Sequence, residues 1–199
     1  NSKSIEDYIK KKKAKILIHL AGLSRPMNIH EENIKKSINL NIIGTSKIVI
    51  GCSKFNVKLI YISTNFVYPG TKGNYNEDDD LKPINNYAWS KLGGEAAVKL
   101  YKNSLILRVC TTEEPFIHNK AFTDVRTNFE YHANISPIIF KLIKKKGIVN
   151  IGGKAQTVYN FAKSKGVNVK KISAKKLFGK HYPTRQDMSI KKMNKFLNI

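Results

Sequence analysis

The chain has 199 residues, of which 41% are hydrophobic and 25% are charged, a composition typical of folded globular proteins. Its 36 lysines and arginines outnumber its 14 aspartates and glutamates, which gives a formal net charge of +22. No apolar run approaches the roughly 20 residues that a membrane-spanning helix needs, so we expect no membrane-embedded segment.

The first residues, Asn1 to Lys13, are polar and rich in lysine. Because they lack the apolar stretch of a secretion signal, we expect no signal peptide and a cytoplasmic protein. Cys52 and Cys110 are isolated from one another and have no metal-type spacing. The sequence therefore predicts neither a disulfide framework nor a cysteine zinc site, as suits a reducing compartment.

The positive charge has two interpretations. Lysines that neutralise phosphates bind polyanions of any sequence, which would make this a nucleic-acid-binding surface. Arginines, which form bidentate phosphate contacts, number only four, and the lysines are spread in short groups over predicted helices. The pattern favours a solvated lysine surface, with a polyanion-binding surface as the alternative. The four arginines are Arg25, Arg108, Arg126 and Arg185.

The first half of the chain alternates between helices and short apolar strands. Ser4, with Asp7 three residues on, has the pattern of a capping box and predicts a helix that ends at Lys12. The further predicted elements are a strand over Lys15–Leu20, a helix over Ile29–Phe55 that bends near Gly44, a strand over Val57–Ser63, a loop over Asn65–Asn86, a helix over Tyr87–Tyr101 and a strand over Ser104–Val109.

After Cys110 the pattern loosens, and residues 111–134 are expected to be mostly irregular. The alternation of strands and helices predicts an α/β fold with a parallel sheet, helices on both of its faces, and a smaller second lobe at the carboxyl edge of the sheet. The elements predicted for this second part are helices over Ile135–Lys145 and Val158–Lys165 and strands over Gly147–Gly152 and Val167–Ile172.

Tyr87 and Lys91 are four residues apart on a predicted helix, so their side chains share a face. A lysine ammonium beside a phenol favours the phenolate, which predicts a lowered pKa for Tyr87 and a role in proton transfer. The spacing alone is weak, because other tyrosines of this lysine-rich chain share it. What distinguishes this pair is Ser63–Thr64 at the carboxyl end of a buried strand, where parallel sheets bind their ligands.

Four segments, in order, resemble one family: His19–Gly22, Asn41-Ile-Ile-Gly-Thr45, Tyr61–Tyr68 and Asn86-Tyr-Ala-Trp-Ser-Lys-Leu-Gly-Gly-Glu95. Together they are similar to the landmarks of the extended short-chain dehydrogenases/reductases, also called the NAD-dependent epimerase/dehydratase family, which act on nucleotide sugars. The subfamily that they resemble most is that of dTDP-4-dehydrorhamnose reductase. The resemblance covers essentially the whole chain, including Pro183–Ser189 near its end.

The resemblance implies a Rossmann-type fold and a set of site residues. Thr64, Tyr87 and Lys91 match the catalytic residues. Ala21, Gly22 and Asn41, with Tyr87 and Lys91, match positions that bind NADPH or NADH, and Asn41 would help to fix the helix that carries Lys91. Thr64, Asn65 and Arg185 match positions that bind the nucleotide-sugar substrate.

The chain departs from the family in two places. It has no glycine-rich turn for the cofactor pyrophosphate, so we expect a fold that lacks the first βαβ element and does not bind the dinucleotide in the family's manner. Asn65 and Phe66 also stand where the resemblance leads us to expect carboxylates, which disfavours a dehydratase. On this basis residues 1–110 would form a truncated dinucleotide-binding domain, and residues 111–199 mostly a substrate-binding lobe.

Three functions remain open at this point. The resemblance favours the NAD(P)H-dependent reduction of a nucleotide-linked 4-keto-6-deoxy sugar, and a nucleotide-sugar 4-epimerase would use the same residues. From another class, a non-catalytic descendant of a reductase could bind a polyanion or serve as a structural protein. We expect a nucleotide-sugar partner, a possible homodimer and no metal site, and we interpret the acidic run Glu77–Asp80 as a solvated loop.

Overall fold

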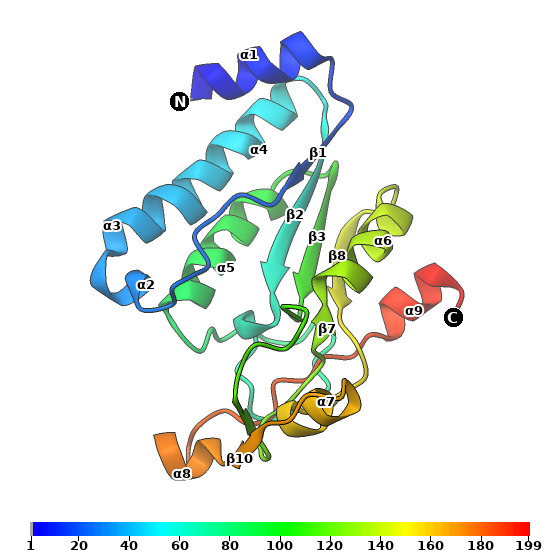
Figure 1. The fold of residues 1–199 in the computed structure, drawn as a ribbon. Helices are drawn as coiled ribbons and strands as arrows, with labels where there is room; N and C mark the ends of the chain where they lie inside the picture. Colours follow the sequence, from blue (N-terminus) through cyan, green and yellow to red (C-terminus); the bar gives the residue numbers. More distant parts are fainter. Residues whose placement is uncertain (1) are drawn as a thin grey trace.

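A computed structural model describes residues 2–199. Its centre is a four-stranded parallel sheet in the order β1-β2-β3-β8, shown in Figure 1. The strands are β1 (Ile16–His19), β2 (Lys58–Thr64), β3 (Ser104–Val109) and β8 (Gly147–Ile151). In register, Ile18 lies beside Ile60, which lies beside Leu105. The predicted α/β fold with a parallel sheet is confirmed, and within the described residues no strand lies beyond β1.

Helices cover both faces of this sheet. On one face, α1 (Ser2–Lys12), α4 (Gly44–Lys54) and α5 (Asn86–Lys99) pack against β2 and β3 through a core that includes Cys52, Leu59 and Val98. On the other face, α6 (His132–Leu142) and α9 (Lys191–Leu197) form a core with Ile60 and Leu107. Because side chains alternate along a strand, Leu59 and Ile60 point to opposite cores.

The amino-terminal helix begins earlier than predicted. It starts at Ser2, so Ser4 lies inside the helix and the predicted capping box is wrong. The strand that follows, β1, is less buried than expected: Ile16 is 39% exposed. Among the described strands β1 lies at the edge of the sheet, which leaves one side without a neighbouring strand. Strand β2, with a neighbour on each side, is buried throughout except for the half-buried Ile62.

The long helix predicted over residues 29–55 is divided into four pieces. They are α2 (Ile29–Glu32), α3 (Ile34–Ser37), a π-helical segment η1 (Ile38–Ile43) and α4. Asn33 ends the first piece and caps the second, since its side chain accepts a hydrogen bond from the backbone of Lys36 at 2.9 Å. Gly44 follows the π-helical segment with ordinary helical backbone angles (φ −58°, ψ −48°), and the bend predicted near it stays a prediction. A π-helical widening often accompanies functional sites.

Helix α5 approaches the sheet very closely at one glycine. It begins where the Asn85 side chain accepts a hydrogen bond from the backbone of Ala88 at 2.8 Å. A Cβ at Gly94 would stand 2.6 Å from the backbone oxygen of Asn41 and 2.6 Å from the hydroxyl of Tyr61. Only glycine therefore allows α5 to lie against both β2 and the π-helical segment.

The rest of the chain forms short elements around a further core that includes Phe116, Tyr131 and Phe161. The predicted strand over 167–172 is β10 (Lys170–Ile172), which pairs with β5 outside the main sheet. Strand β8 comes from beyond residue 110 yet pairs with β3; the predicted domain boundary stays a prediction. The other elements are η2 (Asn65–Val67), β4 (Thr111–Thr112), β5 (Lys120–Phe122), β6 (Arg126–Thr127), β7 (Glu130–Tyr131), β9 (Gln156–Thr157), α7 (Val158–Ser164) and α8 (Ala174–Phe178).

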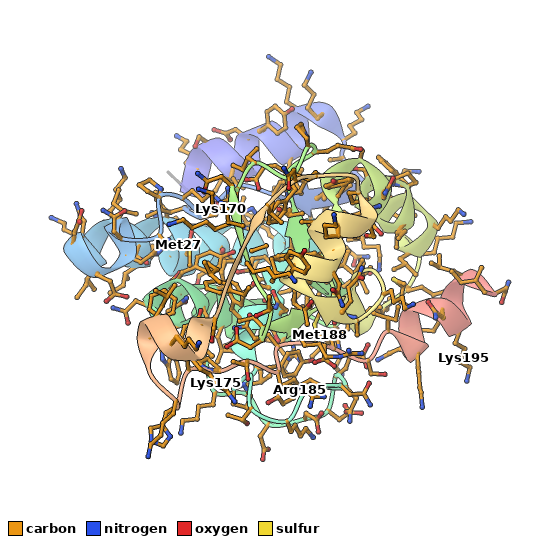
Figure 2. All side chains as sticks on the ribbon, turned by 60° about the horizontal axis from the view of Figure 1, so that its bottom comes forward. Met27, Lys170, Lys175, Arg185, Met188 and Lys195 are labelled. Atoms are coloured by element: carbon orange, nitrogen blue, oxygen red, sulfur yellow. The ribbon has the colours of Figure 1, made fainter. Side chains whose placement is uncertain are left out.

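No helix formed by residues 2–199 is both long and apolar enough to cross a bilayer. The surface carries many lysines, and side chains extend outward around the edge of the molecule in Figure 2. Lys170, Lys175 and Lys195 are among the exposed lysines.

Candidate active site

A cavity of about 620 Å³ lies at the carboxyl ends of the central strands. It brings together residues that are far apart in the sequence: Gly22 from beyond β1, Thr64 from β2, Val109 from β3, and Tyr87 and Lys91 from α5. This is the edge at which parallel α/β sheets bind ligands. Of the residues predicted for the site, Gly22, Thr64, Asn65, Tyr87 and Lys91 line the cavity.

Tyr87 lies half-buried in this cavity. Its ring makes T-shaped contacts with the rings of His30 and Phe66, at centroid distances of 5.2 and 6.5 Å. Burial raises its pKa, and hydrogen bonding with Thr64 and the positive charge of Arg25 only partly offset that rise. The prediction of a lowered pKa for Tyr87 is therefore wrong for this structure. Removal of the phenolate from water outweighs the nearby charges, so Tyr87 is a neutral phenol at pH 7.

Lys91 is buried, with 8% of its surface exposed. Its ammonium group lies over the Tyr61 ring, 4.2 Å from the centroid. Burial lowers the pKa of Lys91 to about 8, although the negative charge of Glu95 acts in the opposite direction. Burial and the positive charge of Lys91 lower the pKa of His19 to about 4, so His19 is neutral at pH 7.

Asn41 lies behind the cavity wall and is not among its lining residues. Its side-chain oxygen accepts a hydrogen bond from the backbone of Leu23 at 2.7 Å, and its nitrogen donates to Leu23 O and to Ser90 Oγ, both at 2.8 Å. Asn41 thus ties the segment after β1 to the helix that carries Lys91. Ala21, predicted with Gly22 to line the cofactor, is also absent from the lining.

Asn65 contributes an unsatisfied polar group. It is 5% exposed, and its side-chain nitrogen has no hydrogen-bond partner, although its oxygen accepts from Thr64 at 3.4 Å. An unpaired buried donor is costly unless a ligand or water accepts from it. Its position on the cavity wall marks this part of the cavity as one that fits a polar ligand.

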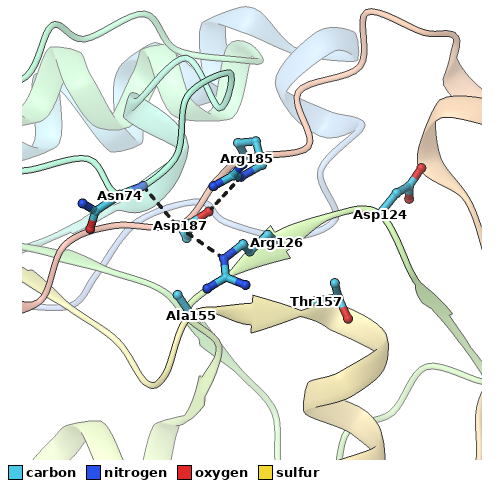
Figure 3. Close-up of a pocket in the computed structure, with 7 residues that line it drawn as sticks. All are labelled: Asn74, Asp124, Arg126, Ala155, Thr157, Arg185 and Asp187. Atoms are coloured by element: carbon cyan, nitrogen blue, oxygen red, sulfur yellow. Dashed lines mark hydrogen bonds and ion pairs between the residues drawn. The ribbon is translucent and has the colours of Figure 1, made fainter.

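Arg185 does not line the same cavity as Tyr87. It lines a separate one of about 480 Å³ together with Arg126, Thr157 and Asp187, as Figure 3 shows. The buried Asp187 carboxylate lies 3.6 Å from Nε of Arg185 and 3.7 Å from Nε of Arg126, and it accepts a hydrogen bond from the backbone of Asn74 at 3.0 Å. Both guanidinium groups are thereby held at one surface, an arrangement suited to an anion.

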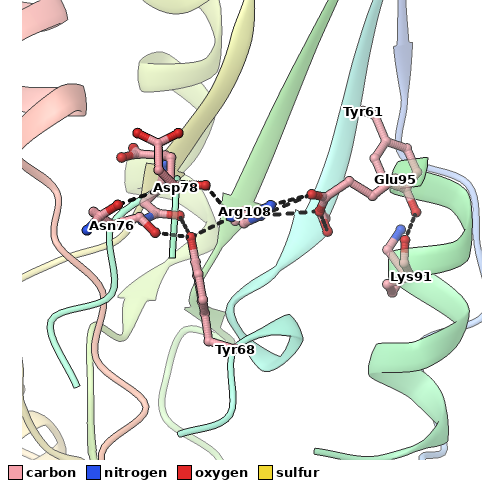
Figure 4. Close-up of polar contacts among 10 residues, drawn as sticks. Tyr61, Tyr68, Asn76, Asp78, Lys91, Glu95 and Arg108 are labelled. Atoms are coloured by element: carbon pink, nitrogen blue, oxygen red, sulfur yellow. Dashed lines mark hydrogen bonds and ion pairs between the residues drawn. The ribbon is translucent and has the colours of Figure 1, made fainter. Parts of the chain in front are cut away.

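A buried polar network behind the cavity was not predicted. The Arg108 guanidinium donates to Glu95 on α5 at 2.6 Å and to the Tyr68 hydroxyl at 2.7 Å (Figure 4). Ser63 also donates to Glu95, at 2.7 Å. Tyr68 in turn donates to Asn150 on β8 at 2.9 Å. Arg108 stands in a strand that was predicted to be buried. Because a buried arginine needs a carboxylate partner, this position could have indicated a buried ion pair from the sequence.

Further lining residues also escaped prediction. Arg25 and Glu113 form an ion pair on the cavity wall, and His118 and His132 face the same space. Their separation in the sequence gives no pattern that would group them. Residues 2–199 contain no cluster of three or more metal-ligating side chains.

Comparison with known families and curated proteins finds several relatives of the chain. A family model described as the RmlD substrate binding domain matches residues 1–113. A dTDP-D-glucose 4,6-dehydratase of Dictyostelium discoideum is 28% identical over 174 residues, which is 81% of this chain and 38% of that protein. The methionine adenosyltransferase 2 subunit beta of Xenopus tropicalis is 34% identical over 99 residues, 49% of this chain and 29% of that protein.

Solved structures share the fold at low sequence identity. The dTDP-4-dehydrorhamnose reductase of Bacillus anthracis in complex with NADP has a TM-score of 0.84 and 22% identity, over 100% of this chain and 79% of that one. MoeE5 in complex with UDP-glucose and NAD has a TM-score of 0.75 and 15% identity, over 98% and 76%. The chain spans well under half the length of the curated relatives that it matches.

Proposed function

The chain belongs to the family of the RmlD substrate-binding domain, and on that premise we propose that it reduces a nucleotide-linked 4-keto-6-deoxy sugar with NADPH or NADH. The observation that carries this proposal is the convergence of Thr64, Asn65, Tyr87 and Lys91 on one cavity. A protonated phenol and a buried ammonium group beside a space of this size suit the reduction of a carbonyl.

The residues present fit the nicotinamide end of the cofactor. Gly22 lines the cavity without a side chain, and a Cβ there would stand 3.0 Å from Asn41 Oδ1 and 4.0 Å from Lys91 Nζ. The Lys91 ammonium carries three donors, which suit ribose hydroxyls. When bound, the reduced nicotinamide supplies the hydride that reduces the carbonyl carbon.

In the proposed reaction Tyr87 donates its proton to the ketone oxygen. Its raised pKa keeps the phenol protonated at neutral pH, which is the state that a general acid needs. Thr64, which lines the same cavity as Tyr87, orients the same oxygen. The unpaired side-chain nitrogen of Asn65 donates to the sugar, so that its hydrogen bond is made only when substrate is present.

The second cavity is proposed to hold the diphosphate of the nucleotide. Arg126 and Arg185 are each about half exposed, and Asp187 fixes both from behind. Guanidinium groups presented in this way bind phosphate oxygens by charge-assisted hydrogen bonds. This assigns to Arg185 the substrate-binding role that the sequence resemblance implies.

The scarcity of acidic side chains among the described residues that line the main cavity supports a reductase over a dehydratase. Elimination of water needs a carboxylic acid and a carboxylate at the sugar, whereas Asn65 and Phe66 occupy the corresponding wall. Among the described residues that line this cavity, Glu113 is the only acid, and it is paired with Arg25. A 4-epimerase would use the same Thr64 and Tyr87 and remains the second candidate.

The test is NADPH oxidation with dTDP-4-dehydrorhamnose as substrate, followed by identification of the product. Tyr87→Phe is expected to lower turnover by at least ~100-fold, the scale of a lost general acid. Tyr8→Phe, at a position that is 61% exposed, is the matched control and should keep full activity. Unchanged turnover in Tyr87→Phe would contradict the mechanism, and interconversion of sugars without net NADPH consumption would identify an epimerase.

A further inference from the structure

Lys91 is a buried cation whose ammonium group makes a cation–π contact instead of pairing with a carboxylate. Within residues 2–199, no carboxylate lies within 4.0 Å of its ammonium group, whose described contact is the face of the Tyr61 ring at 4.2 Å from the centroid. Tyr61 is fully buried in the core between the sheet and α5. A desolvated ammonium over an aromatic face is attracted by the negative face of the ring.

Tyr61 holds the same residue a second time through its hydroxyl. The phenol donates a hydrogen bond of 3.0 Å to the backbone oxygen of Lys91, shown in Figure 4. This contact depends on the glycine at position 94, because a Cβ there would stand 2.6 Å from the Tyr61 hydroxyl. One side chain on β2 thus contacts both the backbone and the charged end of a residue on α5.

We propose that Tyr61 is the positioning residue for Lys91, with its ring holding the ammonium group and its hydroxyl holding the backbone. The proposal rests on the proposed function, because it concerns the lysine of that site. Tyr61 itself touches no part of the main cavity, since it is not among the lining residues. It acts only through Lys91, by keeping the ammonium both charged and directed at the cavity.

The groups near Lys91 favour or disfavour its protonated form. Glu95, one helical turn away, favours the charged form, and burial disfavours it. His19 on β1 is neutral at pH 7 and lies against the Tyr61 ring at a centroid distance of 5.7 Å. The remaining titratable or charged groups that face the cavity are Arg25, Tyr87, Glu113, His118 and His132. Substitutions confined to the Tyr61 ring keep every one of these residues, although His19 contacts the ring itself.

The test measures the protonation of Lys91 directly and needs neither cofactor nor turnover. Acetylation by isotope-labelled acetic anhydride is followed across pH, and the Lys91 peptide is quantified by mass spectrometry. Tyr61→Phe retains the ring, so the labelling midpoint of Lys91 should stay near that of the parent chain, about 8. Phenylalanines with one to three ring fluorines at position 61 keep the shape but weaken the negative face of the ring.

In this fluorine series the Lys91 midpoint should fall stepwise, by about one pH unit in total, a tenfold increase in neutral amine at fixed pH below the midpoint. Lys145, whose ammonium lies 4.6 Å from the Phe196 centroid, is the internal control, and its labelling should not respond to the fluorines at position 61. Because every variant is close in shape to tyrosine, the series does not depend on a substitution that empties the core. A midpoint that stays the same across the series would overturn the proposal.

A second measurement separates this proposal from the proposed function. Affinity for NADPH is determined for the parent and the fluorine series at pH 7. A parent chain that binds no NADPH while its Lys91 midpoint still falls with fluorination would contradict the proposed function and support the role of Tyr61. A parent chain that binds NADPH while the midpoint is unaffected would do the reverse.

Discussion

The Arg108 guanidinium and the Glu95 carboxylate form a buried ion pair, in which Nη2 lies 2.6 Å from Oε1 and each side chain is at most 3% exposed. Arg108 Nε adds contacts of 3.2 and 3.3 Å to the two oxygens. The pair joins β3 to the helix that carries Lys91, one turn from that residue. It therefore connects the sheet to the proposed site.

Breaking this pair should destabilise the chain strongly. Glu95→Gln leaves the Arg108 charge buried without its counter-charge, which is expected to lower the free energy of unfolding by about 3–5 kcal/mol. Urea unfolding monitored by circular dichroism measures the change. As a matched control, Lys54→Ala removes the exposed pair with Glu6 and should cost less than about 1 kcal/mol. Equal effects of the two substitutions would refute the structural role assigned to the buried pair.

Gly94 should be intolerant of even one methyl group. In an ordinary helix interior, Gly→Ala stabilises by about 1 kcal/mol. At position 94 the added Cβ would meet the Asn41 backbone oxygen and the Tyr61 hydroxyl at 2.6 Å, so Gly94→Ala should instead destabilise by about 1–3 kcal/mol. The Cβ of Gly51→Ala on α4 would meet side-chain atoms alone, the methyl groups of Ile5 and Ile9 at 3.2 and 3.3 Å and Glu6 Cγ at 4.0 Å, so this substitution should be nearly neutral. Thermal unfolding of both variants gives the comparison, and stabilisation by Gly94→Ala would rule out the close approach.

His19 should make the fold sensitive to acid. Its folded pKa of about 4 lies below the ordinary 6.5, so between these values the unfolded chain binds a proton that the folded chain does not. The free energy of unfolding should therefore fall as the pH falls from 6.5 to 4, with this residue contributing about 3 kcal/mol of the loss. The loss arises from burial of the ring beside Thr45, whose hydroxyl lies 3.0 Å from His19 Nε2.

Urea unfolding at pH 7 and at pH 4 tests this dependence. His19→Gln should remove most of that part of the acid loss, whereas His181→Gln, at an exposed position, should retain the pH dependence of the parent chain. If His19→Gln and the parent lost equal stability between the two pH values, the buried neutral histidine would be disproved.

The two arginines of the second cavity should affect substrate and cofactor differently. Arg185→Ala or Arg126→Ala removes one charge-assisted contact to the diphosphate, so each should weaken nucleotide-sugar binding by about 10-fold or more. The affinity for NADPH should not change, because neither arginine lines the main cavity. Lys180→Ala, an exposed lysine outside both cavities, is the control. Isothermal titration with a nucleoside diphosphate sugar measures the effect, and parent-like affinity in both arginine variants would exclude this cavity as the diphosphate site.

The regular core was predictable from local patterns. The strand predicted over Ser104–Val109 has the same bounds in the structure, because a continuous apolar run between turn signals has few alternatives. The four-residue spacing of Tyr87 and Lys91 and their place after a strand that ends at Thr64 were sufficient to predict that all three lie together. Helical periodicity and parallel topology fix these relationships before any tertiary detail is known.

What the sequence did not predict depends on contacts between distant segments. Nothing local indicates that Arg108 pairs with Glu95, or that Arg185 faces a separate cavity from Tyr87. The pKa of Tyr87 is raised rather than lowered, because the effect of burial exceeds that of the neighbouring charge. The four-residue spacing carries no information about burial. The break at Asn33 in the long predicted helix likewise reflects a side-chain cap rather than a loss of apolar periodicity.

The most direct test of the account is a titration of the chain with NADPH, following energy transfer from the protein aromatics, including Trp89 on α5. Although the chain has no glycine-rich turn for the pyrophosphate, we expect saturable binding through the nicotinamide end of the cofactor, weakened at least ~10-fold by Lys91→Met, because that substitution removes the charged donor from the cavity. Lys99→Met, an exposed position on the same helix, should bind as the parent does. An absence of saturable binding, or equal affinity in the parent and Lys91→Met, would contradict the proposal that this cavity holds the nicotinamide cofactor.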